Sequence, residues 1–385
     1  MSLEKFETVT LADVSINNKG DYGIGASAVD YSDELYTYLR ITDINDDGTL
    51  NKNDLKSVDD KDAKNYLLKE NDVVFARTGN STGKAYYYDK MDGELVYAGF
   101  LIKFSLDPLK INPKFMKYYV LSEEYKGWVN SMCTGSTRPN INAKMYGNME
   151  LTLPSRKQQD FLVNILDKFD KKIEINKRIN KNLTRISSNI FRSLVNNENV
   201  DEYLELNEIC KFIKGRKPKE ISDNYQSNFS NYLTIEALTN QNQTYAYDEK
   251  GVEANEYDIL MVMDGASSGK MFYGKKGLVG STLAKIDVKE GYQEIIFQFL
   301  KFNEKYISDN TTGSAIPHTD KGLILNLKCP LSNKLLEYSN IFKDIRTSII
   351  SNNEEIITLQ KLRDTLLPNL MSGEIDVSKI NCDLE

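Results

Sequence analysis

Two glycine-rich segments have the residue types and spacing that come nearest to a known binding chemistry. The first reads Gly-Asn-Ser-Thr-Gly-Lys at positions 79–84, and the second reads Gly-Ala-Ser-Ser-Gly-Lys at positions 265–270. A phosphate-binding P-loop requires GxxxxGK followed by Ser or Thr, whose hydroxyl binds Mg²⁺. Both segments are one residue short, and Ala85 or Met271 follows the lysine. The spacing therefore favours turns between strands, in which glycine supplies positive φ, over a nucleotide site.

Side chains suited to catalysis or to metal binding are sparse. The single histidine, His318, aligns with Asn140 in the first half, and the four cysteines are isolated, without a CxxC pair. No two prolines are adjacent, so the Asn/Asp-Pro-Pro-aromatic tetrapeptide of amino-methyltransferases is absent. The sequence therefore predicts a protein that is not an enzyme and that holds no metal or cofactor of its own.

Two further polar loops offer groups that can contact DNA. They read Thr-Gly-Ser-Thr-Arg-Pro-Asn-Ile-Asn at positions 134–142 and Thr-Gly-Ser-Ala-Ile-Pro-His-Thr-Asp at positions 312–320. They either scaffold the domain or contact DNA, because Arg and Asn make bidentate base contacts and Lys binds phosphate. The candidate contacts in these loops and the glycine-rich turns are Arg77, Asn80, Lys84, Arg138, Asn140, Lys144, Ser267, Lys270 and His318.

A basic segment stands out from an acidic chain. The net charge of −7 argues mildly against nucleic acid as a partner, but the local field steers a polyanion more than net charge does. Residues 211–219 are either a solvated surface or a loop that tracks phosphates. The positive residues of this predicted loop are Lys211, Lys214, Arg216, Lys217 and Lys219.

The elements that must position these residues are duplicated. The first β-like run (8–14 and 203–209), the glycine-rich segment, the Thr-Gly-Ser loop and a Leu-x-x-Pro step occur twice in the same order, at offsets that drift from about 195 to about 176 residues. Such a pattern indicates a repeated module. In each half, short β-like runs broken by turn residues precede the repeated loops, and no regular βαβ alternation supports a doubly wound sheet.

Each half ends in a segment with long helical periodicity. Apolar positions recur at spacings that alternate between 4 and 3, the seam of a left-handed coiled coil. An ordinary core helix is the alternative, but periodicity over so many turns in both halves favours the coiled coil. The first track is Leu162, Leu166, Phe169, Ile173, Asn176, Asn180, Leu183, Ser187, Ile190 and Leu194, and Ile175, Ile179 and Ile186 broaden it. The second is Tyr338, Phe342, Ile345, Ile349, Asn352, Ile356, Leu359, Arg363, Leu366 and Leu370.

Asn176 and Asn352 occupy the same register near the middle of the two helices. Antiparallel helices related by a twofold axis meet at equivalent positions only at their centre, and an Asn pair there fixes register at some cost in stability. Either the two residues pair in this way, or each faces solvent.

Composition fits a soluble multidomain protein. With 385 residues, the chain can bury a large core and form more than one domain. No apolar run is long enough to span a bilayer, and the first residues lack a secretory signal, so we expect a cytoplasmic protein without a membrane partner. The predicted parts are two domains (1–154 and 202–330), two helices (155–194 and 331–371) and a tail (372–385).

Two sequence segments resemble segments of a known protein family. Leu-Thr-Leu-Pro-Ser-Arg-Lys-Gln-Gln at positions 151–159 is similar to the junction between the first recognition domain and the first helix of type I restriction–modification specificity subunits. Leu-Arg-Asp-Thr-Leu-Leu-Pro-Asn-Leu-Met-Ser-Gly-Glu-Ile at positions 362–375 resembles their usual ending. The resemblance covers essentially the whole chain. The second junction, at 331–335, departs from it by lacking the Gln pair of 158–159, which leaves the start of the second helix open.

The resemblance implies an α+β fold with two pseudo-twofold-related target recognition domains, separated by two long antiparallel coiled-coil helices. It also implies a non-catalytic subunit that reads a bipartite, asymmetric double-stranded DNA target. Two methyltransferase subunits would dock on the helices, bring S-adenosylmethionine and methylate adenine. A restriction subunit can join them and supply ATP- and Mg-dependent cleavage. A helix of about 50 Å, from 162 to 194, would hold the recognition modules roughly 14 base pairs apart.

Two alternative functions, an enzyme and a protein-binding adaptor, remain open. An ATPase or other enzyme that uses the glycine-rich loops would be stabilised by nucleotide. A coiled-coil adaptor that binds only protein would show no salt-dependent affinity for DNA.

Overall fold

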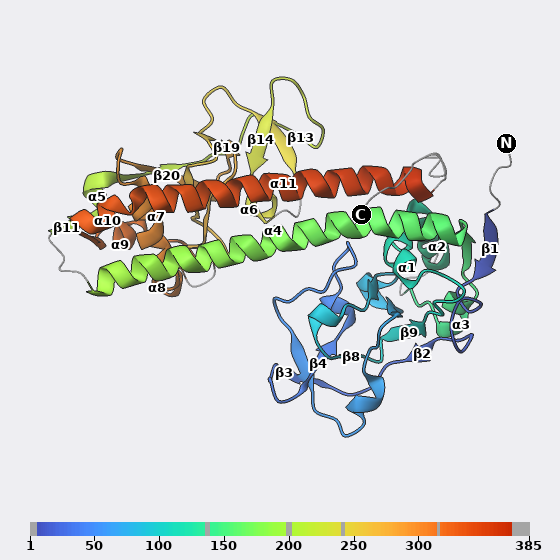
Figure 1. Cartoon of the computed structure of the whole chain (residues 1–385). Helices are drawn as coiled ribbons and strands as arrows, with labels where there is room; N and C mark the ends of the chain where they lie inside the picture. The colour runs from blue at the N-terminus through green and yellow to red at the C-terminus, as the bar shows by residue number, and fades with distance from the viewer. Residues whose placement is uncertain (1–5, 135–138, 198–201, 240–242, 314–315, 372–385) are drawn as a thin grey trace. The chain divides into compact units, whose positions relative to one another are not determined.

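The computed structural model describes residues 6–134, 139–197, 202–239, 243–313 and 316–371 (Figure 1). The chain divides into two compact units, Met1–Lys172 with Thr358–Glu385 and Ile173–Ile357. The division passes through both long helices, α4 (Arg156–Asn197) and α11 (Ser339–Met371), so each unit holds a recognition domain and a piece of each helix.

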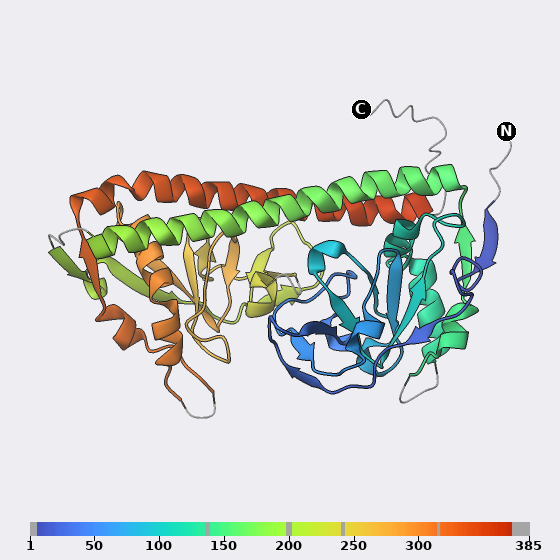
Figure 2. The ribbon, with the colours of Figure 1, turned by 60° about the horizontal axis from the view of Figure 1, so that its bottom comes forward.

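The domain of the first unit is built on three sheets. A two-stranded antiparallel ladder pairs the strand that enters the domain with the strand that leaves it, beside the start of α4 (Figure 2). In spatial order the sheets are β1 (Glu7–Thr10) and β10 (Glu150–Leu153); β2 (Asp21–Tyr22), β9 (Leu101–Ser105), β6 (Asp72–Ala76) and β7 (Ala85–Tyr87); and β3 (Ala28–Asp30), β5 (Lys56–Val58), β4 (Tyr36–Leu39) and β8 (Leu95–Tyr97). The helices are α1 (Pro113–Tyr119), α2 (Glu123–Cys133), α3 (Ala143–Gly147) and the 3₁₀ turns η1 (Ile41–Asp43), η2 (Ala63–Tyr66), η3 (Gly79–Ser81) and η4 (Lys90–Asp92).

The second unit repeats this plan. Its sheets are β11 (Glu202–Glu205) and β21 (Lys328–Leu331); β12 (Cys210–Lys214), β20 (Leu283–Val288), β17 (Ile259–Val262) and β18 (Met271–Phe272); and β13 (Glu220–Ser222), β15 (Thr244–Tyr247), β14 (Ser230–Leu233), β19 (Gly277–Val279) and β16 (Glu253–Ala254). The helices are α5 (Leu206–Ile209), α6 (Ile235–Leu238), α7 (Gln293–Phe302), α8 (Glu304–Asp309), α9 (Lys321–Leu325) and α10 (Asn333–Glu337).

The strand orders of the two domains correspond sheet by sheet, which confirms the duplicated module. Each has an entry ladder, an antiparallel four-stranded sheet, and a mixed sheet with one parallel pair, β4–β8 in the first and β14–β19 in the second. The second mixed sheet gains only the short strand β16. The α+β class with two similar domains and long helices is therefore confirmed, and no βαβ winding occurs among the described strands.

The long helices enter the hydrophobic core of each unit. In the first unit, Leu162 and Leu166 of α4 and Leu367 of α11 are buried with α1 and the β2–β9–β6–β7 sheet. In the second unit, Phe191 and Leu194 of α4 join Phe342 of α11 and α7 in one cluster. The ten-residue coiled-coil tracks are buried or half-buried at every described position, so their spacing identified the inward faces of both helices. Ile175, Ile179 and Ile186, which were expected to broaden the first track, are exposed instead.

The predicted pairing of Asn176 with Asn352 is wrong. Asn176 Nδ2 donates to Glu355 Oε2 at 2.7 Å, whereas Asn352 Nδ2 donates to Asn180 Oδ1 at 2.8 Å, all within the second unit. Asn180 also donates to Asn353 Oδ1 at 2.9 Å, which confirms that the helices run antiparallel. The axial register is offset by about one turn, so the two equivalent residues do not face each other.

The second long helix begins later than predicted. Residues 328–331 form β21, whose Leu331 pairs with Glu202 across the entry ladder. The Ser332 hydroxyl then accepts from Leu335 N and caps the short helix α10, and α11 starts only at Ser339. The first junction differs because Gln158 Oε1 accepts from Ser155 N at the start of α4. The second half, which lacks the Gln pair, thus has a helix start that is interrupted between α10 and α11. The first long helix, α4, ends at Asn197 rather than at the predicted residue 194.

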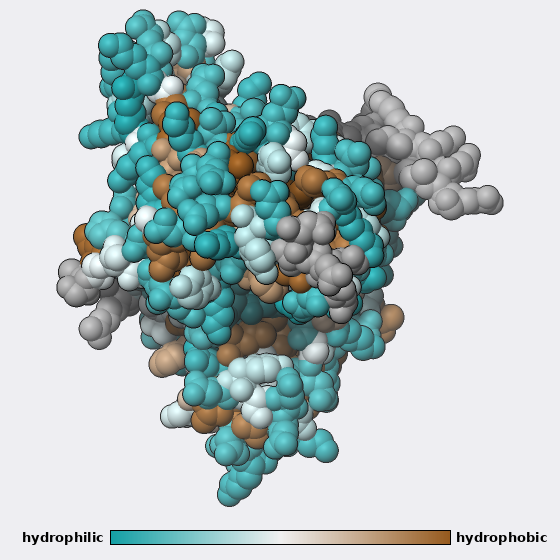
Figure 3. Space-filling view, turned by 90° about the vertical axis from the view of Figure 1, so that its left-hand side faces the viewer, coloured by the Kyte–Doolittle hydropathy of each residue, from teal (hydrophilic) through white to brown (hydrophobic). Residues whose placement is uncertain are grey.

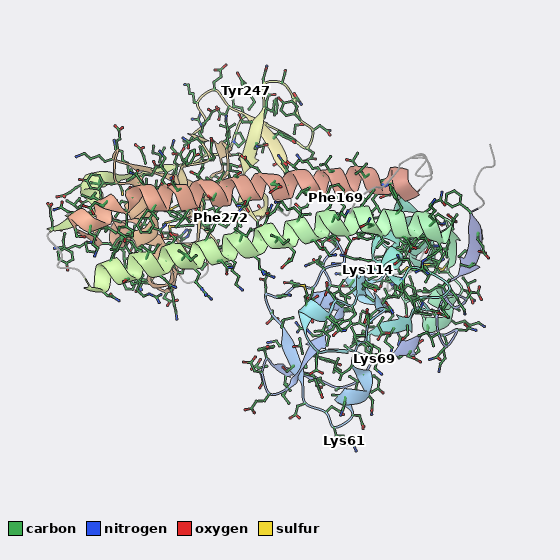
Figure 4. All side chains as sticks on the ribbon, viewed as in Figure 1. Lys61, Lys69, Lys114, Phe169, Tyr247 and Phe272 are labelled. Carbon is green, nitrogen blue, oxygen red and sulfur yellow. The ribbon has the colours of Figure 1, made fainter. Side chains whose placement is uncertain are left out.

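Each domain is tied to a long helix by ion pairs. In the first unit, Lys114 Nζ on α1 lies 3.1 Å from Asp167 Oδ1 of α4; Lys114 is labelled in Figure 4. Asp170 accepts from Lys117 Nζ at 2.6 Å and from Arg363 Nη1 of α11 at 3.0 Å. Burial acts to raise the pKa of Asp170, but Lys117 and Arg363 outweigh it and lower the pKa.

In the second unit the tie runs from Glu294 on α7 to Arg346 on α11, whose guanidinium is hydrogen-bonded to the Glu294 carboxylate. Arg346 Nη1 also donates to Tyr257 O at 3.0 Å, and the Tyr257, Tyr273 and Phe297 rings lie within 6 Å of the guanidinium carbon. Burial raises the pKa of Glu294, and Arg346 only partly opposes it.

Neither a membrane-spanning helix nor a cluster of metal-binding side chains occurs among the described residues. None of the described helices is both long and apolar enough to cross a bilayer. On the face shown in Figure 3, hydrophilic residues predominate and hydrophobic ones lie scattered among them. Among the described residues, no three His, Cys, Asp or Glu side chains are placed to hold a metal ion.

Candidate nucleic-acid interface

The two glycine-rich segments form the same turn. Gly83 N donates to Ala76 O at 3.0 Å and Lys84 N to Ser81 O at 2.9 Å; Gly269 N and Lys270 N make the equivalent bonds to Val262 O and Ser267 O at 2.9 and 3.0 Å. All four turn glycines have positive φ, from 76° to 104°. The turns join antiparallel strands, as predicted, and these amides donate within the turn, so they are not available to cradle a phosphate.

The described ends of the Thr-Gly-Ser loops, 139–142 and 316–320, lie directly against these turns. In the first domain, Ile141 N donates to Arg77 O at 2.9 Å. In the second, Thr319 N donates to Met263 O at 2.8 Å, and the Ser268 hydroxyl donates to Pro317 O at 2.9 Å. Two motifs that are far apart in sequence thus form one surface in each domain. The candidate Arg138 lies outside the described residues.

In the first domain, three side chains converge at this surface. The Arg77 guanidinium lies 4.9 Å from the centre of the Tyr22 ring, and Arg77 Nε is 3.5 Å from Asn140 Oδ1. Tyr22, on β2, is exposed, and its hydroxyl accepts from Ala143 N. Arginine and asparagine are the side chains best suited to bidentate contact with guanine and adenine. Sequence reasoning missed Tyr22, which belongs to a two-residue strand without a motif.

In the second domain, the equivalent backbone positions carry different chemistry. Lys214 on β12 pairs with Ala284, just as Tyr22 on β2 pairs with Ile102 in the equivalent strands of the first domain. Asp264 forms a β-bridge with His318, just as Thr78 forms one with Asn140. Sequence alignment had already matched His318 with Asn140. The second domain therefore has Lys214, Met263, Asp264 and His318 at the positions that Tyr22, Arg77, Thr78 and Asn140 occupy in the first domain.

The second cluster is held together by Asp264. Its carboxylate accepts from Lys214 Nζ at 3.0 Å and lies 2.7 Å from His318 Nδ1. Burial acts to raise the pKa of Asp264, but the hydrogen bonds from His318 and Lys214 outweigh it and lower the pKa. Asp264 was not among the predicted contacts. Its place beside the glycine-rich turn was the only signal for it.

The two turn lysines lie in different surroundings. Lys84 Nζ is 2.8 Å from Asp46 Oδ1, so an acidic loop already holds it. Lys270 Nζ lies 5.4 Å from the centre of the Phe272 ring, the residue labelled in Figure 4. Lys270 and Ser267 also line an open pocket of about 510 Å³ with Glu304 and Lys305. The second turn therefore has a hollow beside it, whereas the lysine of the first turn is held by an ion pair.

Asn80 and Lys144 are exposed on the first domain, in η3 and on α3.

The predicted basic loop of the second domain is partly a strand. Lys211 and Lys214 belong to β12, and Arg216 Nη2 lies 2.9 Å from Asp248 Oδ1. A dense run of charge does not reveal strand pairing, so the loop prediction was wrong for this part. Lys217 and Lys219 follow the strand and are exposed.

The sequence profile of a family described as type I restriction modification DNA specificity domain matches residues 3–185 and 198–358. The MjaVIII type I restriction enzyme specificity subunit of Methanocaldococcus jannaschii is 30% identical over 177 residues, which are 44% of this chain and 42% of the relative. The chain thus matches less than half the length of that relative. The MjaIX specificity subunit of the same organism is 22% identical over 310 residues, 69% of this chain and 70% of the relative.

A solved structure has a similar fold. The type I restriction–modification S subunit from M. genitalium matches with a TM-score of 0.60 and 17% identity, over 96% of this chain and 97% of that chain. The family profile matches both repeated halves and the first part of α4, up to residue 185. The chain belongs to the specificity-subunit family of type I restriction–modification systems.

Proposed function

We propose that each recognition domain reads one half of a bipartite double-stranded DNA target. One observation carries this proposal: at four equivalent backbone positions the two domains present different sets of hydrogen-bonding groups. Identical frameworks with different donors and acceptors are what two readers of unlike half-sites need. Lys217 and Lys219 would add sequence-independent contacts to phosphate.

The long helices are the proposed docking surface for two methyltransferase subunits. Ile175, Ile179 and Ile186 of α4 are between 42% and 50% exposed and recur along one side of the helix. Apolar side chains repeated on an exposed helix face fit a partner helix. In this proposal the chain itself is non-catalytic and acts in the cytoplasm. S-adenosylmethionine would enter with the methyltransferase subunits, and ATP and Mg with a restriction subunit.

The test is to map methylated adenines in DNA modified by the full chain together with its methyltransferase subunit. We expect two short specific sequences separated by a non-specific gap. Exchanging residues 1–154 for the corresponding domain of a related subunit should change one half-site and leave the other intact. If both half-sites change together, the domains do not read DNA independently. If the assembled complex shows no salt-dependent affinity for DNA, the chain is instead a protein-binding adaptor.

A further inference from the structure

We propose that His318 makes the reading of the second half-site depend on pH, whereas the first domain reads its half-site without such dependence. This inference rests on the proposed function, and it assigns a specificity-determining role to one side chain. His318 is the only histidine in the chain. Histidine is the side chain that ordinarily changes charge between about pH 5 and pH 8.

The backbone holds His318 firmly at the surface. Thr312 N donates to His318 O at 2.8 Å, and His318 N donates to Thr312 O at 2.7 Å. Gly313 closes this bridge at φ 92°, where an added Cβ would lie 2.4 Å from Ile316 O, so only glycine fits. The His318 side chain is nevertheless 50% exposed. The fold thus fixes the position of the ring and leaves part of it open to a ligand.

The contact with Asp264 determines which ring nitrogen carries the proton. The pKa of Asp264 is lowered, so its carboxylate is ionised near neutral pH and can only accept hydrogen bonds. His318 Nδ1, 2.7 Å away, must therefore be the donor. In the neutral ring this leaves Nε2 as an acceptor, which suits the exocyclic amine of cytosine or adenine. In the protonated ring Nε2 becomes a donor, which suits the acceptors of guanine.

The charges around His318 make its protonation consequential. Lys214 reaches the cluster from β12 and Asp264 from the turn after β17, and their charges cancel. The loop 311–319 contains no other titratable residue by sequence. Protonation therefore leaves the cluster with a net positive charge beside the proposed DNA surface, in addition to inverting the hydrogen bond that Nε2 offers.

Neighbouring charged groups are engaged elsewhere. Asp320 caps α9 by accepting from Leu323 N, and Lys321 Nζ lies over the Phe212 ring at 5.8 Å. Across the pocket that Pro317 borders, Glu304 pairs with Lys301, and Lys270 lies over Phe272; Lys305 also lines that pocket.

The first domain has no counterpart to this group. Its equivalent positions hold Tyr22, Arg77, Thr78 and Asn140, and none of these side-chain types ordinarily changes charge between about pH 5 and pH 8. The two domains of one chain therefore provide an internal control.

The experiment uses the full chain assembled with its methyltransferase subunits, after methylation mapping has defined both half-sites. Competition binding is measured with duplexes that each carry one substituted base pair, at about pH 6 and about pH 8 and constant ionic strength. At one or more positions of the second half-site, the discrimination ratio should change by about fivefold or more between the two pH values. The ratios for the first half-site should stay constant.

The variants His318→Gln and His318→Asn should abolish the pH change, because neither amide titrates, while discrimination at the first half-site persists. Asn140→Gln is the matched control, and it should leave the pH response of the second half-site intact. An equal pH response at both half-sites in the wild type, or a response that survives His318→Gln, overturns the inference but not the proposed function. Absence of any second half-site at either pH overturns both.

Discussion

In the first unit, cations on the short helix α1 meet carboxylates on the long helix α4, and in the second unit the polarity is reversed. Lys114 and Lys117 pair with Asp167 and Asp170, whereas Glu294 of α7 pairs with Arg346 of α11. The environments also differ. The Lys117 side chain is 32% exposed, whereas those of Arg346 and Glu294 are 2% and 8% exposed. The first tie is a partly exposed network of several ion pairs, and the second is a single buried pair.

This difference shows how a duplicated fold can keep its halves from docking on the wrong helix. If α1 were placed against α11, its lysines would meet Arg346 and Lys343. If α7 were placed against α4, Glu294 would meet Asp167 and Asp170. Like charges brought together in a partly buried site are strongly unfavourable. Reversed polarity therefore favours the native assignment of each domain to its own helix segment.

Breaking the buried pair should have the largest effect. Arg346→Met leaves Glu294 buried without its partner, and we expect the second unit to lose about 3–5 kcal/mol of unfolding free energy. Urea denaturation followed by hydrogen exchange of peptides from α7 measures this loss. The only tryptophan, Trp128, lies in the first unit, so its fluorescence transition is the internal control.

The double variant Arg346→Met with Glu294→Leu should recover most of that stability, because no unpaired charge then remains. A loss below about 1 kcal/mol in the single variant, typical of an exposed pair, would contradict the buried environment described for Arg346.

Breaking the partly exposed ion-pair network of the first unit should lower the unfolding free energy by less. Asp170→Asn removes the charge that Lys117 and Arg363 share, and we expect a loss of about 1–3 kcal/mol from the first unit. The Trp128 fluorescence transition in urea reports it. Glu123→Gln, which breaks the exposed pair with Lys126, is the matched control and should cost no more than about 1 kcal/mol. Equal losses in the two variants would show that Asp170 has no special role.

The outermost pair of the network should contribute least. Lys114 is the more exposed cation of the first tie, and Asp167 is shared with Lys171 at 2.7 Å. A double-mutant cycle of Lys114→Ala and Asp167→Asn should therefore give a coupling energy of about 0.2–1 kcal/mol. A coupling energy as large as the loss caused by Arg346→Met would mean that the two ties do not differ in strength.

The two ties should also respond to pH with opposite sign. The pKa of Asp170 is lowered on folding, so its stabilisation is present above its unfolded pKa and is lost as the pH falls through the lowered value. The pKa of Glu294 is raised, so its contribution is present below its unfolded pKa and is lost as the pH rises through the raised value. On acidification, hydrogen-exchange protection should fall in α1 before α7. The reverse order would contradict these pKa directions.

Sequence patterns predicted much of this architecture because repetition aligns residues without coordinates. The match of Asn140 with His318 holds in three dimensions, since both form the same bridge to the glycine-rich turn. Heptad spacing identified the buried helix faces. It did not give the axial register, because which turn of α4 faces which turn of α11 depends on packing along the whole helix pair, and so Asn176 was paired wrongly.

Other features of the candidate interface lay beyond the sequence. Tyr22 reaches Arg77 only through strand pairing between β2 and β9, a contact between distant segments that no motif marks. Lys214 was expected to face phosphate, but it donates to Asp264 across the sheet. Charge density predicts an electrostatic field, whereas the partner of each charge is decided by tertiary structure.

The glycine-rich turns satisfy their own backbone hydrogen bonds, and this separates the folding of the surface from its recognition chemistry. The backbone hydrogen bonds that close these turns do not involve the side chains at 77, 80 and 140 or at 267 and 318. Mutations there can accumulate without passing through an unfolded intermediate. If the proposed function holds, substitutions at these positions would change the DNA sequence that is read at little cost in stability, and a library randomised at these positions should retain a high fraction of folded members.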